Sequence, residues 1–184
     1  MNDLIELKLI TRKDAECLHK LQIEAFMPLY EKYQDDATSP AKESLETITK
    51  KIVDDNSDFY FILFNGEKAG TVRVKWYKGP KVHKNVNWIS PIFVIPKFQN
   101  KGIASNVIKQ LFDIYPNTIE WWLSTIKQEE KNCHLWNGCK RVHMRSICQC
   151  LNLKRKSRQG KQLNWIARSG KYLRWLHSLE KRFL

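Results

Sequence analysis

Hydrophobic and polar positions along most of the chain predict alternating strands and helices. Residues 4–10 alternate between the two kinds, which is typical of a strand with one buried face. Apolar residues recur at three- and four-residue steps from Ala15 to Leu29, which predicts an amphipathic helix that Pro28 bends or ends. The same reasoning places helices at 44–53, 101–115 and 128–136, and strands at 59–64, 68–77, 87–95 and 119–126.

The order of these elements predicts a mixed α/β (α+β) fold. Asn65-Gly66 is a strong signal for a two-residue hairpin between the second and third strands. One helix lies between the fourth and fifth strands, so a central sheet flanked by helices is expected. Beyond Trp136 the pattern of apolar and polar residues becomes weaker. It predicts either one strand or none over residues 142–153, and a helix over residues 161–183.

Length and composition fit an ordinary globular protein. A chain of 184 residues has the size of one domain, and no run of 18 apolar residues predicts a membrane span. The N-terminus lacks a basic and then apolar signal pattern, so we expect a cytoplasmic protein. The five cysteines are an odd number without convincing metal-ligand spacing, so neither a disulfide framework nor a metal site is expected.

The net charge of +13 is confined to one end of the chain. Residues 131–184 contain 14 Lys and Arg but a single acid, Glu180, whereas basic and acidic residues balance before that point. We therefore divide the chain into residues 1–136 and a basic, Cys- and Trp-bearing segment, 137–184. Its Lys154-Arg155-Lys156-Ser157-Arg158 run, with aromatic residues downstream, has the character of a nucleic-acid-binding surface.

The most informative segment follows the fourth predicted strand. After Pro96 stops that strand, residues 99–104 lead directly into a helix start. The first turn of a helix carries unpaired N–H groups and the positive end of the helix dipole, which suits a pyrophosphate. Gly102 allows close backbone approach to a ligand, and Lys97 and Lys101 add positive charge. A tight strand-to-helix turn without a ligand is the alternative.

Gln99, Gly102 and Ala104 occupy the three fixed positions of the coenzyme-A-binding loop of GNAT superfamily N-acetyltransferases. The chain resembles this superfamily over about residues 4–136, including Thr125 and the segment 132–135. The resemblance implies a GNAT-like central mixed sheet flanked by helices and acetyl-CoA as co-substrate. The implied activity is transfer of the acetyl group to an amine of unknown identity by direct attack, without a metal.

The resemblance also implies roles for individual residues. Backbone groups of Ile92, Phe93 and Val94 would pair with the pantetheine arm and polarise the thioester carbonyl. Asn132 would contact the pantetheine or the region of the departing thiol. Backbone amides would hold the pyrophosphate, and these belong to Gln99, Asn100, Lys101, Gly102, Ile103 and Ala104.

The general base and acid are not assigned by the loop. Trp136 stands where the family usually places a Tyr acid, and an indole N–H is not a practical acid at neutral pH. Glu120 and Asn132 are the remaining candidates for a catalytic role, although Glu120 reads more simply as a solvated strand residue. A relay of water molecules that removes the proton from the amine is equally compatible with the sequence. Asp35 and Asp36 could attract a cationic amine, but acidic loops are usually only solvated.

Two explanations compete for the basic segment, because the resemblance weakens where the charge balance changes. The segment is either a genuine extension that binds nucleic acid or an acidic partner, or the product of a frameshift near codon 136 in a catalytically defective acetyltransferase. We favour the second because local and global signals agree in an evolved fold. Reading codons 133–140 in all three frames tests the frameshift explanation.

The expected partners of the protein are acetyl-CoA and an amine. Nucleic acid is expected only through the basic segment, no membrane is expected, and a homodimer is an open alternative.

Overall fold

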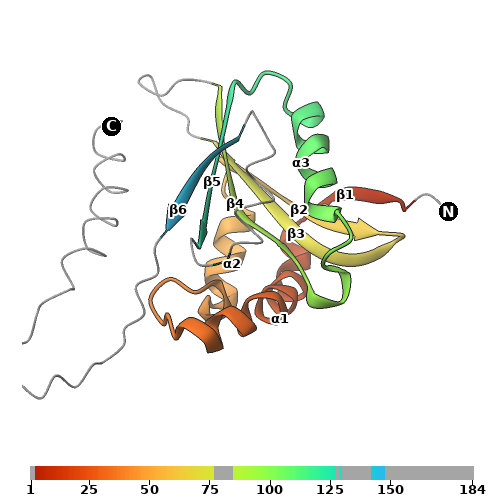
Figure 1. Ribbon diagram of the computed structural model, residues 1–184. Coiled ribbons are helices and arrows are strands. Elements are labelled where there is room, and N and C mark those ends of the chain that lie inside the picture. Colours follow the sequence, from red (N-terminus) through yellow and green to blue (C-terminus); the bar gives the residue numbers. More distant parts are fainter. Residues whose placement is uncertain (1–2, 77–84, 127–128, 130–141, 148–184) are drawn as a thin grey trace, which may run out of the picture.

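The computed structural model describes residues 3–76, 85–126, 129 and 142–147 (Figure 1). The strands are β1 (Ile5–Leu9), β2 (Ser57–Phe64), β3 (Glu67–Trp76), β4 (Val86–Val94), β5 (Glu120–Ile126) and β6 (Val142–Ile147). The α-helices are α1 (Ala15–Tyr33), α2 (Leu45–Ile52) and α3 (Ile103–Ile114), and the short 3-10 helices are η1 (Arg12–Asp14), η2 (Pro40–Lys42) and η3 (Pro96–Phe98).

The described strands form one mixed sheet in the order β1-β2-β3-β4-β5-β6. Neighbours from β1 to β4 are antiparallel, whereas β4 with β5 and β5 with β6 are parallel. Helices α1 and α2 cover one face of the sheet and α3 covers the other (Figure 1). The predicted fold class, a mixed sheet flanked by helices, is confirmed.

Apolar side chains from both faces of the sheet form one core. Leu18 and Ile48 bring α1 and α2 onto one face, and Val107, Ile108 and Leu111 bring α3 onto the other. All five are fully buried, and each fully buried aliphatic side chain contributes roughly 1.5–3 kcal/mol of transfer free energy. The described helices include none that is long and apolar enough to cross a bilayer.

The predicted hairpin at Asn65-Gly66 is confirmed, since the two residues have φ of 51° and 83° and join β2 to β3. Of the two effects expected of Pro28, a bend or an end of the first helix, the end is wrong, because α1 continues to Tyr33. Pro28 removes one N–H donor, but both Pro28 and Glu24, whose carbonyl loses that bond, are exposed to water. The carbonyl can therefore bond to solvent instead.

Beyond Trp136, one of the two open alternatives is confirmed for residues 142–147, which form β6 and pair with β5 along six residues. This strand lies within the basic segment and yet belongs to the same sheet as β1. The helices predicted over 128–136 and 161–183 lie outside the described residues, apart from Glu129.

Candidate functional site

The pairing of β4 with β5 stops partway along both strands. Val86–Ile89 pairs with Glu120–Leu123, but beyond Ile89 β4 pairs only with β3, and beyond Leu123 β5 pairs only with β6. Because these strands are parallel, they separate toward their carboxyl ends, and we call this region the β4–β5 fork. On the fork side of residues 90–94 the described residues provide no ladder partner for the backbone.

A bulge lies where the fork begins. The register between β3 and β4 shifts between Val72 and Val74, so that Ser90 and Pro91 of β4 together oppose Arg73 of β3. An extra residue in one strand bends it and re-aims the groups that follow. The bulge therefore helps β4 to leave β5 while it stays paired with β3.

The β3 side of the fork is held by an unusually close backbone contact. A Cβ atom added to Gly70 would lie 2.0 Å from the Phe93 carbonyl oxygen and 2.9 Å from the Val94 Cα. Only glycine allows β3 to approach β4 this closely, which places Gly70 directly behind the backbone that faces the fork.

The loop after β4 is compact and turns its backbone into the first turn of α3. Asn100 and Gly102 have φ of 62° and 71°, and Gly102 is the N-cap of α3. The Gln99 side chain donates a hydrogen bond from Nε2 to the Val94 carbonyl at 2.9 Å, and Phe98 is buried beside Phe64. The loop is thereby fastened to the ends of β4 and β2.

The end of α3 that follows this loop is suited to an anion. Its first turn contains no acidic residue, and no side chain caps it. The first N–H groups of a helix have no intrahelical acceptor, so those after Gly102 can bind a negatively charged ligand. A Cβ atom at Gly102 would meet nothing within 4 Å, which leaves open space next to the backbone.

Two lysines near the loop differ in how their charges are used. Lys97 Nζ forms an ion pair with Glu67 Oε2 at 2.5 Å. Lys101 Nζ lies 5.0 Å from the Phe64 ring centroid and 5.7 Å from that of Phe98, and has no carboxylate partner among the described residues. The Lys101 charge is therefore available to a ligand at the loop.

The candidate cofactor residues come together in the structure. Ile92, Phe93 and Val94 line one side of the fork, and the loop residues 99–104 follow at its open end. Asn132 and Trp136 lie outside the described residues.

Glu120 lies elsewhere, at the amino end of β5, where that strand is still paired with β4. Its Oε2 accepts a hydrogen bond from Trp122 Nε1 at 3.1 Å, and Trp122 stacks on Trp88 with ring centroids 5.8 Å apart. Glu120 is three residues behind Leu123, the last paired residue, which is about 10 Å along the strand.

A carboxylate that the sequence analysis did not single out lies at the open end of the fork. Glu129 follows β5 and its N–H bonds to the Ile126 carbonyl at 3.0 Å. Its Oε1 accepts hydrogen bonds from Lys32 Nζ and Tyr33 Oη, each at 2.6 Å, and so links the end of α1 to the end of β5. No sequence pattern connects Tyr33 with a residue 96 positions away.

The bonds at Glu129 change the acidity of both partners. Hydrogen bonds from Lys32 and Tyr33 hold the pKa of Glu129 below its ordinary value. The bond to Glu129 raises the pKa of the Tyr33 hydroxyl. At neutral pH the pair is therefore an ionised carboxylate and a neutral phenol.

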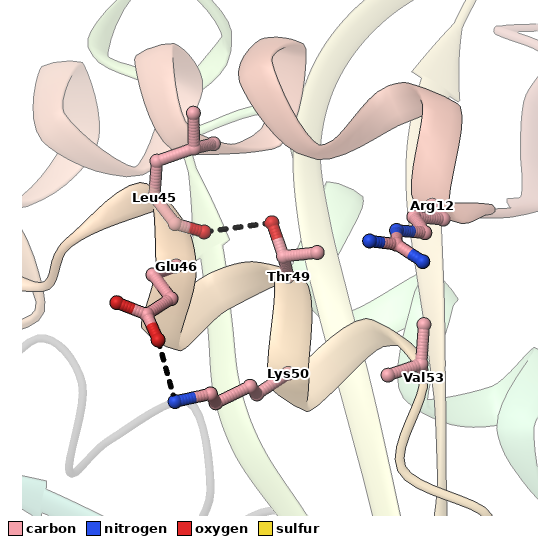
Figure 2. A pocket seen from close by; sticks show the side chains of 6 residues that line it. All are labelled: Arg12, Leu45, Glu46, Thr49, Lys50 and Val53. Atoms are coloured by element: carbon pink, nitrogen blue, oxygen red, sulfur yellow. Dashed lines mark hydrogen bonds and ion pairs between the residues drawn. The ribbon is translucent and has the colours of Figure 1, made fainter.

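A shallow hollow lies on the outer side of α2 (Figure 2). It adjoins η1 near the amino end of β2, whereas the loop after β4 packs against Phe64 at the carboxyl end of β2. The hollow thus lies at the other end of the sheet from the loop. Its lining residues are Arg12, Leu45, Glu46, Thr49, Lys50 and Val53.

The described residues contain no group of three His, Cys, Asp or Glu side chains that could hold a metal ion.

Solved structures with the same arrangement are numerous but distant in sequence. The PaiA N-acetyltransferase from Thermoplasma acidophilum in complex with coenzyme A is 16% identical, with a TM-score of 0.59 over 73% of this chain and 87% of that chain. An acetyltransferase from Thermus thermophilus is 15% identical, with a TM-score of 0.58 over 73% and 84% of the two chains. At these identities the likeness shows the fold alone.

Aminoglycoside acetyltransferases are among the similar structures. The enzyme meta-AAC0020 from an uncultured soil metagenomic sample, in complex with sisomicin, is 14% identical, with a TM-score of 0.57 over 74% of this chain and 87% of that chain. No curated protein matches the sequence. The model of the Acetyltransferase (GNAT) family matches residues 18–139, about two thirds of the chain, and the chain therefore belongs to the GNAT acetyltransferase family.

Proposed function

We propose that this chain is an acetyl-CoA-dependent N-acetyltransferase. The observation that carries the proposal is the β4–β5 fork with the Gly102 loop at its open end. We propose that the pantetheine arm, which contains amides, pairs with backbone groups of residues 92–94 that have no ladder partner on the fork side, apart from the Val94 carbonyl, which accepts from Gln99. The loop offers helix N–H groups to the pyrophosphate. The similar structures that contain coenzyme A support the choice of ligand.

The residues present fit this ligand in shape and charge. The space next to Gly102 allows a phosphate to approach the backbone, and a side chain there would project into that space. Lys101 supplies positive charge, and the first turn of α3 has no acid that would repel a pyrophosphate. We propose that Asn100, Ile103 and Ala104 contribute backbone amides to the same cradle, and that Asn132 contacts the pantetheine. The Gln99 N–H already donates to the Pro96 carbonyl, so Gln99 holds the loop in shape rather than binding the phosphates.

The proposed reaction is direct attack by the acceptor. The lone pair of a neutral amine forms a bond to the thioester carbonyl carbon, and the C–S bond breaks. The amine nitrogen loses one proton and the departing sulfur gains one, which gives an acetamide and the free thiol of coenzyme A. The hydrogen bond to Trp122 and the position of Glu120 at the closed end of the fork argue that Glu120 stabilises the strand end. We propose that water, and not Glu120, removes the proton.

Calorimetric titration with coenzyme A tests the proposal. We expect binding by the unaltered chain and none by Gly102→Glu, because the new carboxylate would occupy the phosphate position. A milder substitution, Gly102→Ala, has a matched control in Gly66→Ala. Both glycines have positive φ and open space around them. Both substitutions strain the backbone by about 1 kcal/mol or more, but only Gly102→Ala should weaken binding. A folded protein without binding heat, or equal effects at the two glycines, would refute the proposal.

Release of the coenzyme A thiol in the presence of an amine panel then tests turnover. The neighbours named as aminoglycoside acetyltransferases support an amine acceptor. Binding of coenzyme A without turnover on any amine would favour the defective-acetyltransferase explanation of the basic segment.

A further inference from the structure

The Gly102 loop and Glu129 adjoin helices that lie on opposite faces of the sheet (Figure 1). The Gly102 loop leads into α3, which covers one face of the sheet, so the proposed cofactor site lies toward that face (Figure 1). An acceptor that reaches the fork from the other side would enter beside the end of α1. Glu129 is bonded to Lys32 and Tyr33 at the end of α1, which places its carboxylate on the acceptor side.

Glu129 is also close to the level at which the acetyl group would be held. Ile126 lies three residues beyond the last β4–β5 pair, Ile89 with Leu123. Ile92 lies two ladder steps beyond the same pair, because Ser90 and Pro91 share one step at the bulge. Glu129 is three residues past Ile126, which is at most about 11 Å even for an extended chain, and the turn closed by its N–H brings it nearer.

One oxygen of Glu129 is left to bind a ligand. Lys32 and Tyr33 both donate to Oε1, and Oε2 has no hydrogen-bond partner in the part of the chain that the structure describes. The side chain keeps 23% of its surface exposed, and Tyr33 beneath it is buried. Two donors fix the carboxylate in place while leaving its second oxygen for a ligand, and a fixed ionised oxygen binds an ammonium group strongly.

The charges around Glu129 also favour a cation. Lys32 contributes one positive charge, but Glu31, Asp35 and Asp36 lie within the same stretch of chain. Asp36 accepts its hydrogen bond from the neutral Tyr30 hydroxyl at 2.7 Å, so this bond does not cancel its charge. Lys42 Nζ lies 4.8 Å from the Tyr30 ring centroid and opposes the Asp36 charge, so residues 31–42 carry three acidic and two basic side chains.

We propose that Glu129 binds a charged amino group of the acceptor, and that the acceptor is a polyamine with at least one further amino group that reacts. The proposal rests on the acetyltransferase function above. The nitrogen that attacks must be neutral, whereas a nitrogen held by an ionised carboxylate stays protonated, so the two must be different atoms. Because the pKa of Glu129 is held below its ordinary value, Glu129 is a poor base at neutral pH and acts as a specificity-determining residue.

The test is a titration of the full chain, saturated with coenzyme A, with spermidine, sisomicin and the monoamine benzylamine. We expect the two polycations to bind about tenfold or more weakly to Glu129→Gln than to the unaltered chain, and benzylamine to bind equally to both. Glu46→Gln, which removes an exposed carboxylate paired with Lys50 on α2, is the matched control and should leave all three affinities unchanged.

A purely structural role for Glu129 predicts something different. It would weaken all three amines alike in Glu129→Gln, and Tyr33→Phe would have the same general effect. In turnover assays the proposal requires KM for the polycation to rise while kcat is kept. Equal binding of polycations by Glu129→Gln and the unaltered chain, or no preference of the unaltered chain for polycations, overturns it. Failure to bind coenzyme A instead refutes the acetyltransferase function, and the same amine titrations without coenzyme A then decide the role of Glu129.

Discussion

Replacing Gly70 with alanine tests the geometry of the fork most directly. The added methyl group would lie 2.0 Å from the Phe93 carbonyl oxygen, 2.9 Å from the Val94 Cα and 3.0 Å from the Phe93 carbonyl carbon. All three are backbone atoms, so no side chain can rotate away. An ordinary contact needs more than 3.4 Å, so β3 and β4 must separate by well over an ångström at this point.

The cost should lie at the upper end of the range for overpacked cores, about 3 kcal/mol. For a chain of this size that corresponds to a fall in melting temperature of roughly 6–12 °C. Gly66→Ala provides the comparison, since it carries the strain of positive φ without a clash, about 1 kcal/mol or 2–4 °C. Displacement of Phe93 and Val94 should also weaken coenzyme A binding in Gly70→Ala, but Gly66→Ala should bind normally.

Thermal unfolding by circular dichroism and calorimetric titration with coenzyme A provide the two measurements. A melting temperature for Gly70→Ala at or above that of Gly66→Ala would show that β3 and β4 are not in close contact there. Loss of stability with full coenzyme A affinity would separate the β3–β4 contact from the cofactor site and refute the link between them.

Four further predictions concern the loop, the carboxylate and the basic segment. Lys101→Ala should weaken coenzyme A binding several-fold more than Lys97→Ala, because the Lys97 charge is already paired with Glu67, and equal losses by calorimetry would contradict this. Because the pKa of Glu129 is depressed in the folded protein, its stabilisation is complete above the unfolded pKa and disappears as pH falls through the folded one. The stability difference between the unaltered chain and Glu129→Gln should therefore shrink only in acid, below about pH 4, in urea titrations at several pH values. A chain ending at residue 147 should melt higher than one ending at 136, since only the longer keeps β6. If the basic segment binds nucleic acid, the chain ending at 147 should lose a salt-dependent DNA affinity that the full chain has.

The sequence was most informative where the relevant contacts are local. The Asn65-Gly66 turn and the loop from Gln99 to Ala104 each depend on neighbouring residues, and the structure has a hairpin and a strand-to-helix turn at these places. Periodicity also located β1 to β5 and the three α-helices to within a few residues. Periodicity could not decide whether Pro28 bends or ends its helix, because the outcome depends on whether the Glu24 carbonyl faces water.

The acceptor side could not be predicted from local patterns. Glu129 gains its properties from Lys32 and Tyr33, which are 97 and 96 residues away. The Gly70–Phe93 contact likewise depends on the register between two strands, and nothing near Gly70 in the sequence distinguishes it from a glycine that is merely tolerated. Long-range pairing of this kind emerges only once the sheet is assembled.

The position of β6 changes how the basic segment should be viewed. Beyond Leu123 β5 has no partner in β4, so β6 alone pairs with residues 124–126 along the fork. Without β6 these residues would have no ladder partner on either edge among the described strands, and this wall of the fork would lose its hydrogen-bonded support. The charge balance changes near Lys131, but the sheet continues to Ile147. Residues inside the acid-poor region therefore support the proposed site, so a change in composition does not by itself mark the end of the acetyltransferase fold.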